Sequence, residues 1–114
     1  MSSLTLSDHM ANVISEYITR FMKPYTGISI AYQVKEAAEA GYLFVRGDGV
    51  LGMTPSESGV WHVLFFVAES TETRKSLLRE AFASIGYIPT VSYSRWKYND
   101  RKRTYSPKLM KRLA

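Results

Sequence analysis

The sequence predicts a single α/β domain over residues 1–114, of the α+β kind, with a small mixed sheet that is mainly antiparallel. Three observations predict this fold class. Apolar residues recur at helical spacing between residues 8 and 40. Three β-forming runs separated by turn residues follow. A strand–helix–strand order comes next, which predicts a β-α-β crossover after a three-strand meander.

The first helix is expected over residues 8–23. Ser7 suits the N-cap position, and Pro24 ends the helical pattern. Seven apolar residues repeat every three or four positions, as expected for one core-facing stripe. They are Met10, Val13, Ile14, Tyr17, Ile18, Phe21 and Met22.

A second, shorter helix is expected over residues 33–40, which are rich in Ala and Glu, and Gly41 suits the position that closes it. The residues just before it are less regular. Ile28, Ile30 and Tyr32 fit either a short strand or an extended linker. The N-terminal part of the chain therefore contributes two helices before any clear strand.

The middle of the chain predicts a meander. Residues 42–45 are β-formers, 46–49 read as a hairpin turn, and 50–54 form the return strand. A second turn is expected over 55–59. The next nine residues, VWHVLFFVA at 60–68, are almost all apolar, which predicts a central strand covered on both faces.

The last third of the chain predicts a helix from Glu69 to about Ser84, ended by Gly86, and then a strand at 89–93. Its inner face is formed by Leu77, Leu78, Ala81, Phe82 and Ile85. Ser106 and Pro107 fit an N-cap followed by proline at the first helical position, so a short C-terminal helix should close the domain.

Composition excludes several classes of protein. No apolar run approaches the roughly 18 residues that a membrane helix needs, and the first residues do not resemble a signal peptide. The chain has no cysteine and two histidines, so we expect neither disulfides nor a metal site. These features favour the cytoplasm.

The positive charge is concentrated at the C-terminal end. Residues 95–114 carry eight basic residues and one acid, a net charge of +7, whereas residues 1–94 carry seven basic and nine acidic residues, a net charge of −2. A basic arm on a slightly acidic body suggests an acidic macromolecule, either nucleic acid or a protein surface, as partner. A solvated terminal arm that aids solubility is the alternative.

Aromatic and cationic residues alternate within this arm. As a strand, 93–98 would place Tyr93, Arg95 and Lys97 on one face and Trp96 with Tyr98 on the other. A turn at Asn99-Asp100 would follow. Cations neutralise phosphates and aromatic rings stack on bases, so the pattern suits single-stranded nucleic acid or an RNA loop. The candidate binding residues are Arg95, Trp96, Lys97, Arg101, Lys102, Arg103 and Lys108. Alternatively, the aromatic residues cover the core and the cations face water.

The element order resembles that of the GCN5-related N-acetyltransferase (GNAT) family over about residues 8–113. The best local match is VWHVLFFVAESTETRKSLLREAF, residues 60–82, where the family has its fourth strand, its pyrophosphate-binding turn and the following helix. The C-terminal half, IPTVSYSRWKYNDRKRTYSPKLMKRL, is similar to small bacteriophage proteins of this fold. The chain stops before the last two strands usual in the family, so the resemblance implies either a truncated fold or a shifted assignment of the N-terminal elements.

The resemblance implies acetyl-CoA as cofactor and acetyl transfer to an amine as the activity. It places Ser70, Thr71, Thr73, Arg74 and Lys75 at the pyrophosphate. The turn lacks the glycines of the family's motif, and Glu72 would repel the phosphates.

An acetyltransferase also needs a base and an acid. The base candidates beside the central strand are Glu57, His62 and Glu69, with Glu69 preferred. A tyrosine, Tyr98 or Tyr105, would supply the acid, and Tyr93 is a further candidate. The alternative function is a non-enzymatic host-interaction, virion or nucleic-acid-binding protein that uses the basic arm. A phage-encoded protein would act in the host cytoplasm or in the virion.

Overall fold

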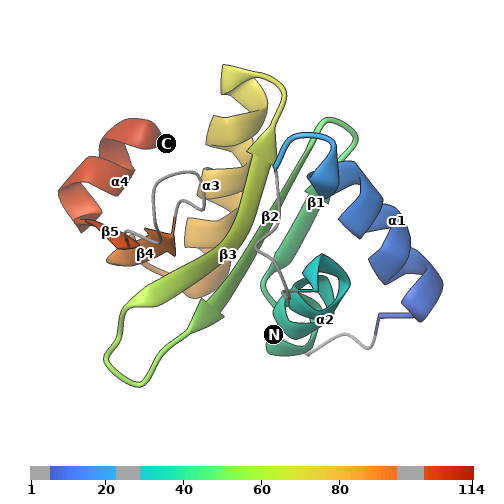
Figure 1. Ribbon diagram of the computed structural model, residues 1–114. Coiled ribbons are helices and arrows are strands. Elements are labelled where there is room, and N and C mark those ends of the chain that lie inside the picture. Colours follow the sequence, from blue (N-terminus) through green and yellow to red (C-terminus); the bar gives the residue numbers. More distant parts are fainter. Residues whose placement is uncertain (1–5, 23–28, 95–101) are drawn as a thin grey trace.

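A five-stranded sheet, with its strands side by side in chain order, organises the protein (Figure 1). The computed structural model describes residues 6–22, 29–94 and 102–114. Within these ranges the elements are α1 (Asp8–Thr19), α2 (Ile30–Ala40), β1 (Leu43–Arg46), β2 (Gly49–Pro55), β3 (Trp61–Ala68), α3 (Thr71–Ile85), β4 (Val91–Ser94), β5 (Lys102–Tyr105) and α4 (Pro107–Leu113).

The sheet is mixed, which confirms the predicted fold class. β1, β2 and β3 form an antiparallel meander, and α3 then carries the chain across to β4, which pairs with β3 in parallel. β5 pairs with β4 in antiparallel fashion and forms the far edge. This last strand was not predicted, because it is short, two of its four residues are charged, and it lacks the alternating pattern of a half-buried strand.

Helices cover both faces of the sheet and define two cores. α1 and α2 lie on one face, and α3 and α4 lie on the other (Figure 1). We call the first core the α1–α2 core; it contains Ala11, Ile14, Ile18, Ile30, Val34, Ala37, Val50, Phe65 and Val67. We call the second the α3–α4 core; it contains Phe44, Leu51, Met53, Trp61, Leu77, Leu78, Ala81, Phe82, Val91 and Met110.

The central strand β3 contributes to both cores, as its apolar sequence predicts. Phe65 and Val67 belong to the α1–α2 core, whereas Trp61 belongs to the α3–α4 core. Each of these side chains is buried. A strand covered on both faces has no polar alternation, which explains why this run is nearly all apolar.

A β-bulge interrupts β3 at Leu64. On the neighbouring strand, Gly52 is opposite Phe65 and Met53 is opposite Val63, so Leu64 has no residue opposite it. Leu64 and Phe65 both pack on the α1–α2 core, although consecutive strand residues normally face opposite sides. The bulge therefore reverses which residues of β3 face which core.

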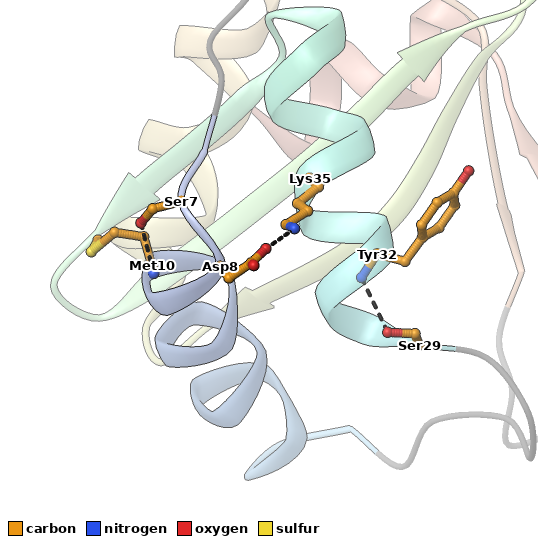
Figure 2. A network of polar contacts seen from close by, with 6 residues as sticks. All are labelled: Ser7, Asp8, Met10, Ser29, Tyr32 and Lys35. Atoms are coloured by element: carbon orange, nitrogen blue, oxygen red, sulfur yellow. Dashed lines mark hydrogen bonds and ion pairs between the residues drawn. The ribbon is translucent and has the colours of Figure 1, made fainter.

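The first helix is shorter and less buried than predicted. α1 ends at Thr19, and the N-cap is Ser7, whose Oγ accepts a hydrogen bond from the Met10 N–H at 3.2 Å (Figure 2). The buried positions are Ala11, Ile14 and Ile18, whereas Met10, Val13 and Phe21 are about half exposed. The predicted apolar stripe was therefore too wide. Only the side of α1 that contains Ala11 is buried in the α1–α2 core, and the small alanine side chain lets a neighbouring helix approach.

The second helix is longer than predicted, and Ile30 and Tyr32 belong to it rather than to a strand or linker. Ser29 caps this helix by accepting a hydrogen bond from the Tyr32 N–H at 3.2 Å (Figure 2). Ile30 and Val34 lie four residues apart and are buried in the same core, which outweighs the low helix propensity of the β-branched isoleucine. Ile28 lies outside the described residues.

The remaining boundaries agree with the sequence. Gly41 and Gly86 end α2 and α3 with φ angles of 87° and 92°, which glycine adopts without steric cost. Ser70 and Ser106 cap α3 and α4, and Pro107 occupies the first turn of α4 as expected. An ion pair between Asp8 and Lys35 joins α1 to α2 (Figure 2).

Replacing Gly52 should destabilise the protein. A Cβ atom at Gly52 would lie 2.3 Å from the ring of Phe65, which is fully buried and cannot move away. We expect Gly52→Ala to lower the free energy of unfolding by about 1–3 kcal/mol, the usual cost of overpacking a core. Urea denaturation measures this change. Gly47→Ala is the control, because nothing lies within 4 Å of its added Cβ. Equal stability of the two variants would contradict the packing described.

Candidate functional site

The turn between β1 and β2 packs against the start of α3. A Cβ atom at Gly49 would lie 2.7 Å from Thr73 Cγ2 and 2.8 Å from the main-chain oxygen of Val67, so only glycine permits this approach. The turn also accepts a main-chain hydrogen bond at Asp48 O from the N–H of Glu69, at 2.9 Å. The close contact brings the Asp48 side chain to the N-terminus of α3.

A relay of hydroxyl groups connects the α3 N-cap to Asp48. The Ser70 Oγ accepts a hydrogen bond from the Thr73 N–H at 3.1 Å and donates one to Thr73 Oγ1 at 2.9 Å. The buried Thr73 hydroxyl donates in turn to the Asp48 carboxylate. A carboxylate next to a helix N-terminus is stabilised by the helix dipole, and Asp48 adds a negative charge beside the N-terminus of α3.

Tyr17 of α1 extends the polar cluster across the end of the sheet. Its hydroxyl donates a hydrogen bond to Glu69 Oε2 at 2.7 Å. Partial burial raises the pKa of Tyr17 to about 12, and the hydrogen bond to Glu69 and the negative charges of Glu69 and Asp48 act in the same direction. We call Tyr17, Asp48, Glu69, Ser70 and Thr73 the α3 cap cluster.

The structure gathers the predicted cofactor residues in the first turns of α3, but their surroundings are acidic. Ser70 and Thr73 are engaged within the α3 cap cluster, whereas Thr71 is exposed. Arg74 and Lys75 are half-buried, and Arg74 Nε has no hydrogen-bond partner among the described residues. The negative charges of Asp48, Glu69 and Glu72 near this helix terminus disfavour a pyrophosphate.

Of the predicted catalytic residues, Glu69 and Tyr105 do not meet. Glu69 follows the last residue of β3, whereas Tyr105 is opposite Val91, which is opposite Trp61 at the first residue of β3. Seven residues of strand separate the two levels, about 23 Å at the usual rise per residue. The half-buried Tyr105 packs against the α3–α4 core. Tyr98 lies outside the described residues.

The other acid–base candidates are also apart from the α3 cap cluster. Glu57 is exposed in the turn between β2 and β3, and the half-buried His62 is opposite Thr54 near the start of β3. Tyr93, in β4, is opposite Val63 and Arg103.

The pairing between β3 and β4 that the structure describes is short. Their parallel pairing consists of three residue pairs and ends with Val63 opposite Tyr93, although β3 continues from Leu64 to Ala68. Over these last five residues, the edge of β3 that faces β4 is paired with no other strand of the described chain. Free main-chain groups on a strand edge can bind the amides of an extended ligand.

A second candidate site is the basic side of α4. Lys108, Lys111 and Arg112 are exposed and spaced as i, i+3 and i+4, so they share one side of the helix, whereas Met110 is buried and Leu113 is partly buried. We call these three cations the α4 basic surface. Residues 102–114 contain no acid that could neutralise it. Arg79 of α3 lies at its end, donating a hydrogen bond from Nη2 to the main-chain oxygen of Ala114 at 3.3 Å.

Only part of the predicted nucleic-acid site can be placed. Lys108 belongs to the α4 basic surface, and Lys102 and Arg103 lie in β5 opposite Ser94 and Tyr93. The candidates Arg95, Trp96, Lys97 and Arg101, with the expected turn at residues 99–100, lie outside the described residues. The sequence pattern did not indicate Arg79, because its position next to α4 depends on tertiary packing.

The described residues contain neither a metal-binding group nor a membrane-spanning helix. In the described part of the chain, no three His, Cys, Asp or Glu residues are grouped so that they could hold a metal ion. No helix within residues 6–22, 29–94 or 102–114 has the length and apolar character to cross a membrane.

Comparisons with protein-family models, curated proteins and solved structures find no match.

The α3 cap cluster predicts an unusual tyrosine titration. An unfolded tyrosine ionises near pH 10, whereas folded Tyr17 keeps its proton to about pH 12. Its contribution to stability is therefore complete below pH 10 and is lost as the pH rises towards 12. The difference in absorbance at 295 nm between wild type and Tyr17→Phe should have its midpoint near pH 12, and Glu69→Gln should lower that midpoint. A midpoint near 10 in the wild type would refute the contact.

Proposed function

We propose that this protein is a GNAT-like α+β protein that binds an anionic macromolecule, nucleic acid or an acidic protein, through the α4 basic surface. The observation that carries the proposal is the one-sided array of Lys108, Lys111 and Arg112, with no acid in residues 102–114. Exposed cations that share a helix face attract polyanions over a range of about 10 Å at physiological salt.

The element order supports the GNAT-like part of the proposal. Two helices precede an antiparallel meander, and α3 connects β3 to a parallel β4, which is the order on which the resemblance rests. The α3 cap cluster is the reason that we prefer binding to catalysis. It adds the negative charge of Asp48 beside the helix N-terminus to which the resemblance assigns a cofactor phosphate, and the sheet register leaves Glu69 far from Tyr105.

Acetyl transfer from acetyl-CoA to an amine is the second candidate function. The described pairing of β3 with β4 ends at Val63, and an edge of β3 that is unpaired from Leu64 to Ala68 would offer main-chain groups to the amides of a pantetheine arm. The N-terminus of α3 follows this edge, and its first turn contains the exposed residue Thr71. The main-chain N–H groups of a first helical turn have no partner within the helix and can donate to a ligand.

Binding through the α4 basic surface predicts a strong dependence on salt. The triple variant Lys108→Gln/Lys111→Gln/Arg112→Gln should bind a labelled single-stranded oligonucleotide and labelled polyglutamate more weakly than wild type. Its slope of log K against log salt for the oligonucleotide should fall by about 2, since each phosphate contact on a single strand contributes about 0.7. Fluorescence anisotropy at several salt concentrations measures both effects.

The matched control is Arg20→Gln, which removes an exposed cation at the end of α1, on the opposite face of the sheet. This variant should keep the wild-type slope and affinity. If the affinity for both probes is unchanged by salt and by the triple substitution, the α4 basic surface is ruled out as the contact.

The enzymatic candidate predicts stabilisation by acetyl-CoA. Cofactor at 100 times its dissociation constant should stabilise the protein by about 2.7 kcal/mol, seen as a raised melting temperature. Asp48→Asn should strengthen binding, because it removes a negative charge beside the α3 N-terminus. No shift at millimolar acetyl-CoA in either protein would exclude this candidate.

A further inference from the structure

α3 and α4 together form one outer face of the molecule (Figure 1). Tyr105, just before α4, is level with Trp61 in the sheet, because both residues are opposite Val91. Trp61 also donates a hydrogen bond to Tyr87, which lies just after α3. α4 therefore begins beside the C-terminal end of α3. Its last residues reach Arg79 in the middle of α3 through the hydrogen bond to Ala114, so the exposed sides of the two helices adjoin.

The exposed side of α3 next to α4 carries a cationic and aromatic ridge. Lys75, Arg79 and Ala83 follow one another at intervals of four residues, with Lys75 half-buried and the other two exposed, and the exposed Tyr87 follows Gly86 just beyond the end of the helix. Tyr87 is 57% exposed, and its hydroxyl accepts a hydrogen bond from Trp61 Nε1 at 3.2 Å, which orients the ring. Glu80 turns away to pair with Arg46, so the acid on this helix nearest to Arg79 is already neutralised.

We infer that the α3–α4 face binds single-stranded nucleic acid, with Arg79 joining the α4 basic surface at the phosphates and Tyr87 stacking on a base. This inference rests on the proposed function and adds the class of partner. A flat ring held in place at the border of a cationic face suits a base, because every base has a π-face. In a duplex the bases are stacked inside, so the Tyr87 ring could contact them only in a single strand or loop.

The exposed residues also favour nucleic acid over an acidic protein. Carboxylates would be satisfied by Arg79 and the lysines alone, and would gain nothing from Tyr87. A nucleotide gains from both kinds of residue: its phosphate contacts the cations, and its base stacks on the aromatic ring. The two partners therefore differ in whether the Tyr87 ring matters, and this difference can be measured.

The experiment measures binding of a fluorescent 20-nucleotide thymidine strand, its duplex with a complementary strand, and labelled polyglutamate. Tyr87→Leu should weaken binding of the single strand about five-fold or more, at the low end of what one stacked base contributes. Tyr87→Phe keeps the ring and should bind as wild type does. Arg79→Gln should lower the salt slope by about 0.7.

Two variants on the opposite face serve as matched controls. Tyr32→Leu removes the 69% exposed aromatic residue of α2, and Arg20→Gln removes an exposed cation of α1; neither should change binding. Tyr87→Leu and Tyr87→Phe both lose the hydrogen bond to Trp61. A defect caused by that loss would appear in both variants, and one caused by lost stacking appears in Tyr87→Leu alone.

The outcomes separate this inference from the proposed function. If the triple α4 variant loses binding but Tyr87→Leu and Arg79→Gln do not, the inference fails and the proposed function stands. Tighter binding of polyglutamate or of the duplex than of the single strand also overturns the inference alone. If the triple variant binds every probe as wild type does, both fail.

Discussion

The burial of β3 on both faces is the constraint on which the rest of the structure depends. The strand has no polar side, so helices must cover it twice, and α1–α2 and α3–α4 do so with separate cores. Alternation along the strand lets it serve both cores, and the bulge at Leu64 changes which side chains point to which face. The bulge also lies at the level where the described pairing of β3 with β4 ends.

Charge is distributed along α3 in the opposite sense to its dipole. The N-terminus, which carries partial positive charge, is neutralised by Asp48 within the α3 cap cluster, while cations gather around the middle of the helix and along α4. Glu80, the residue after Arg79, forms an ion pair with Arg46. The proposed function therefore assigns phosphates to the α3–α4 face rather than to the N-terminus of α3.

Local sequence patterns predicted the elements that local physics controls. The serine caps at residues 7 and 106, the closing glycines 41 and 86 and the apolar run of β3 each depend on a few neighbouring residues. The start of α2 was missed because Ile30 has a strand-like propensity that burial beside Val34 overrides. β5 was missed because pairing with β4, rather than its own composition, makes it a strand. The contacts Tyr17–Glu69 and Asp48–Thr73 join residues distant in sequence, so no spacing could indicate them.

The contact between Gly52 and Phe65 has an evolutionary consequence. The aromatic ring occupies the volume that a side chain at position 52 would need, so the two positions share one space between them. Substitutions at these positions should be inherited together: a homologue with a larger residue at position 52 should carry a smaller one at position 65. A substitution at one position alone would overpack the core or leave a cavity in it, and selection would remove most such intermediates.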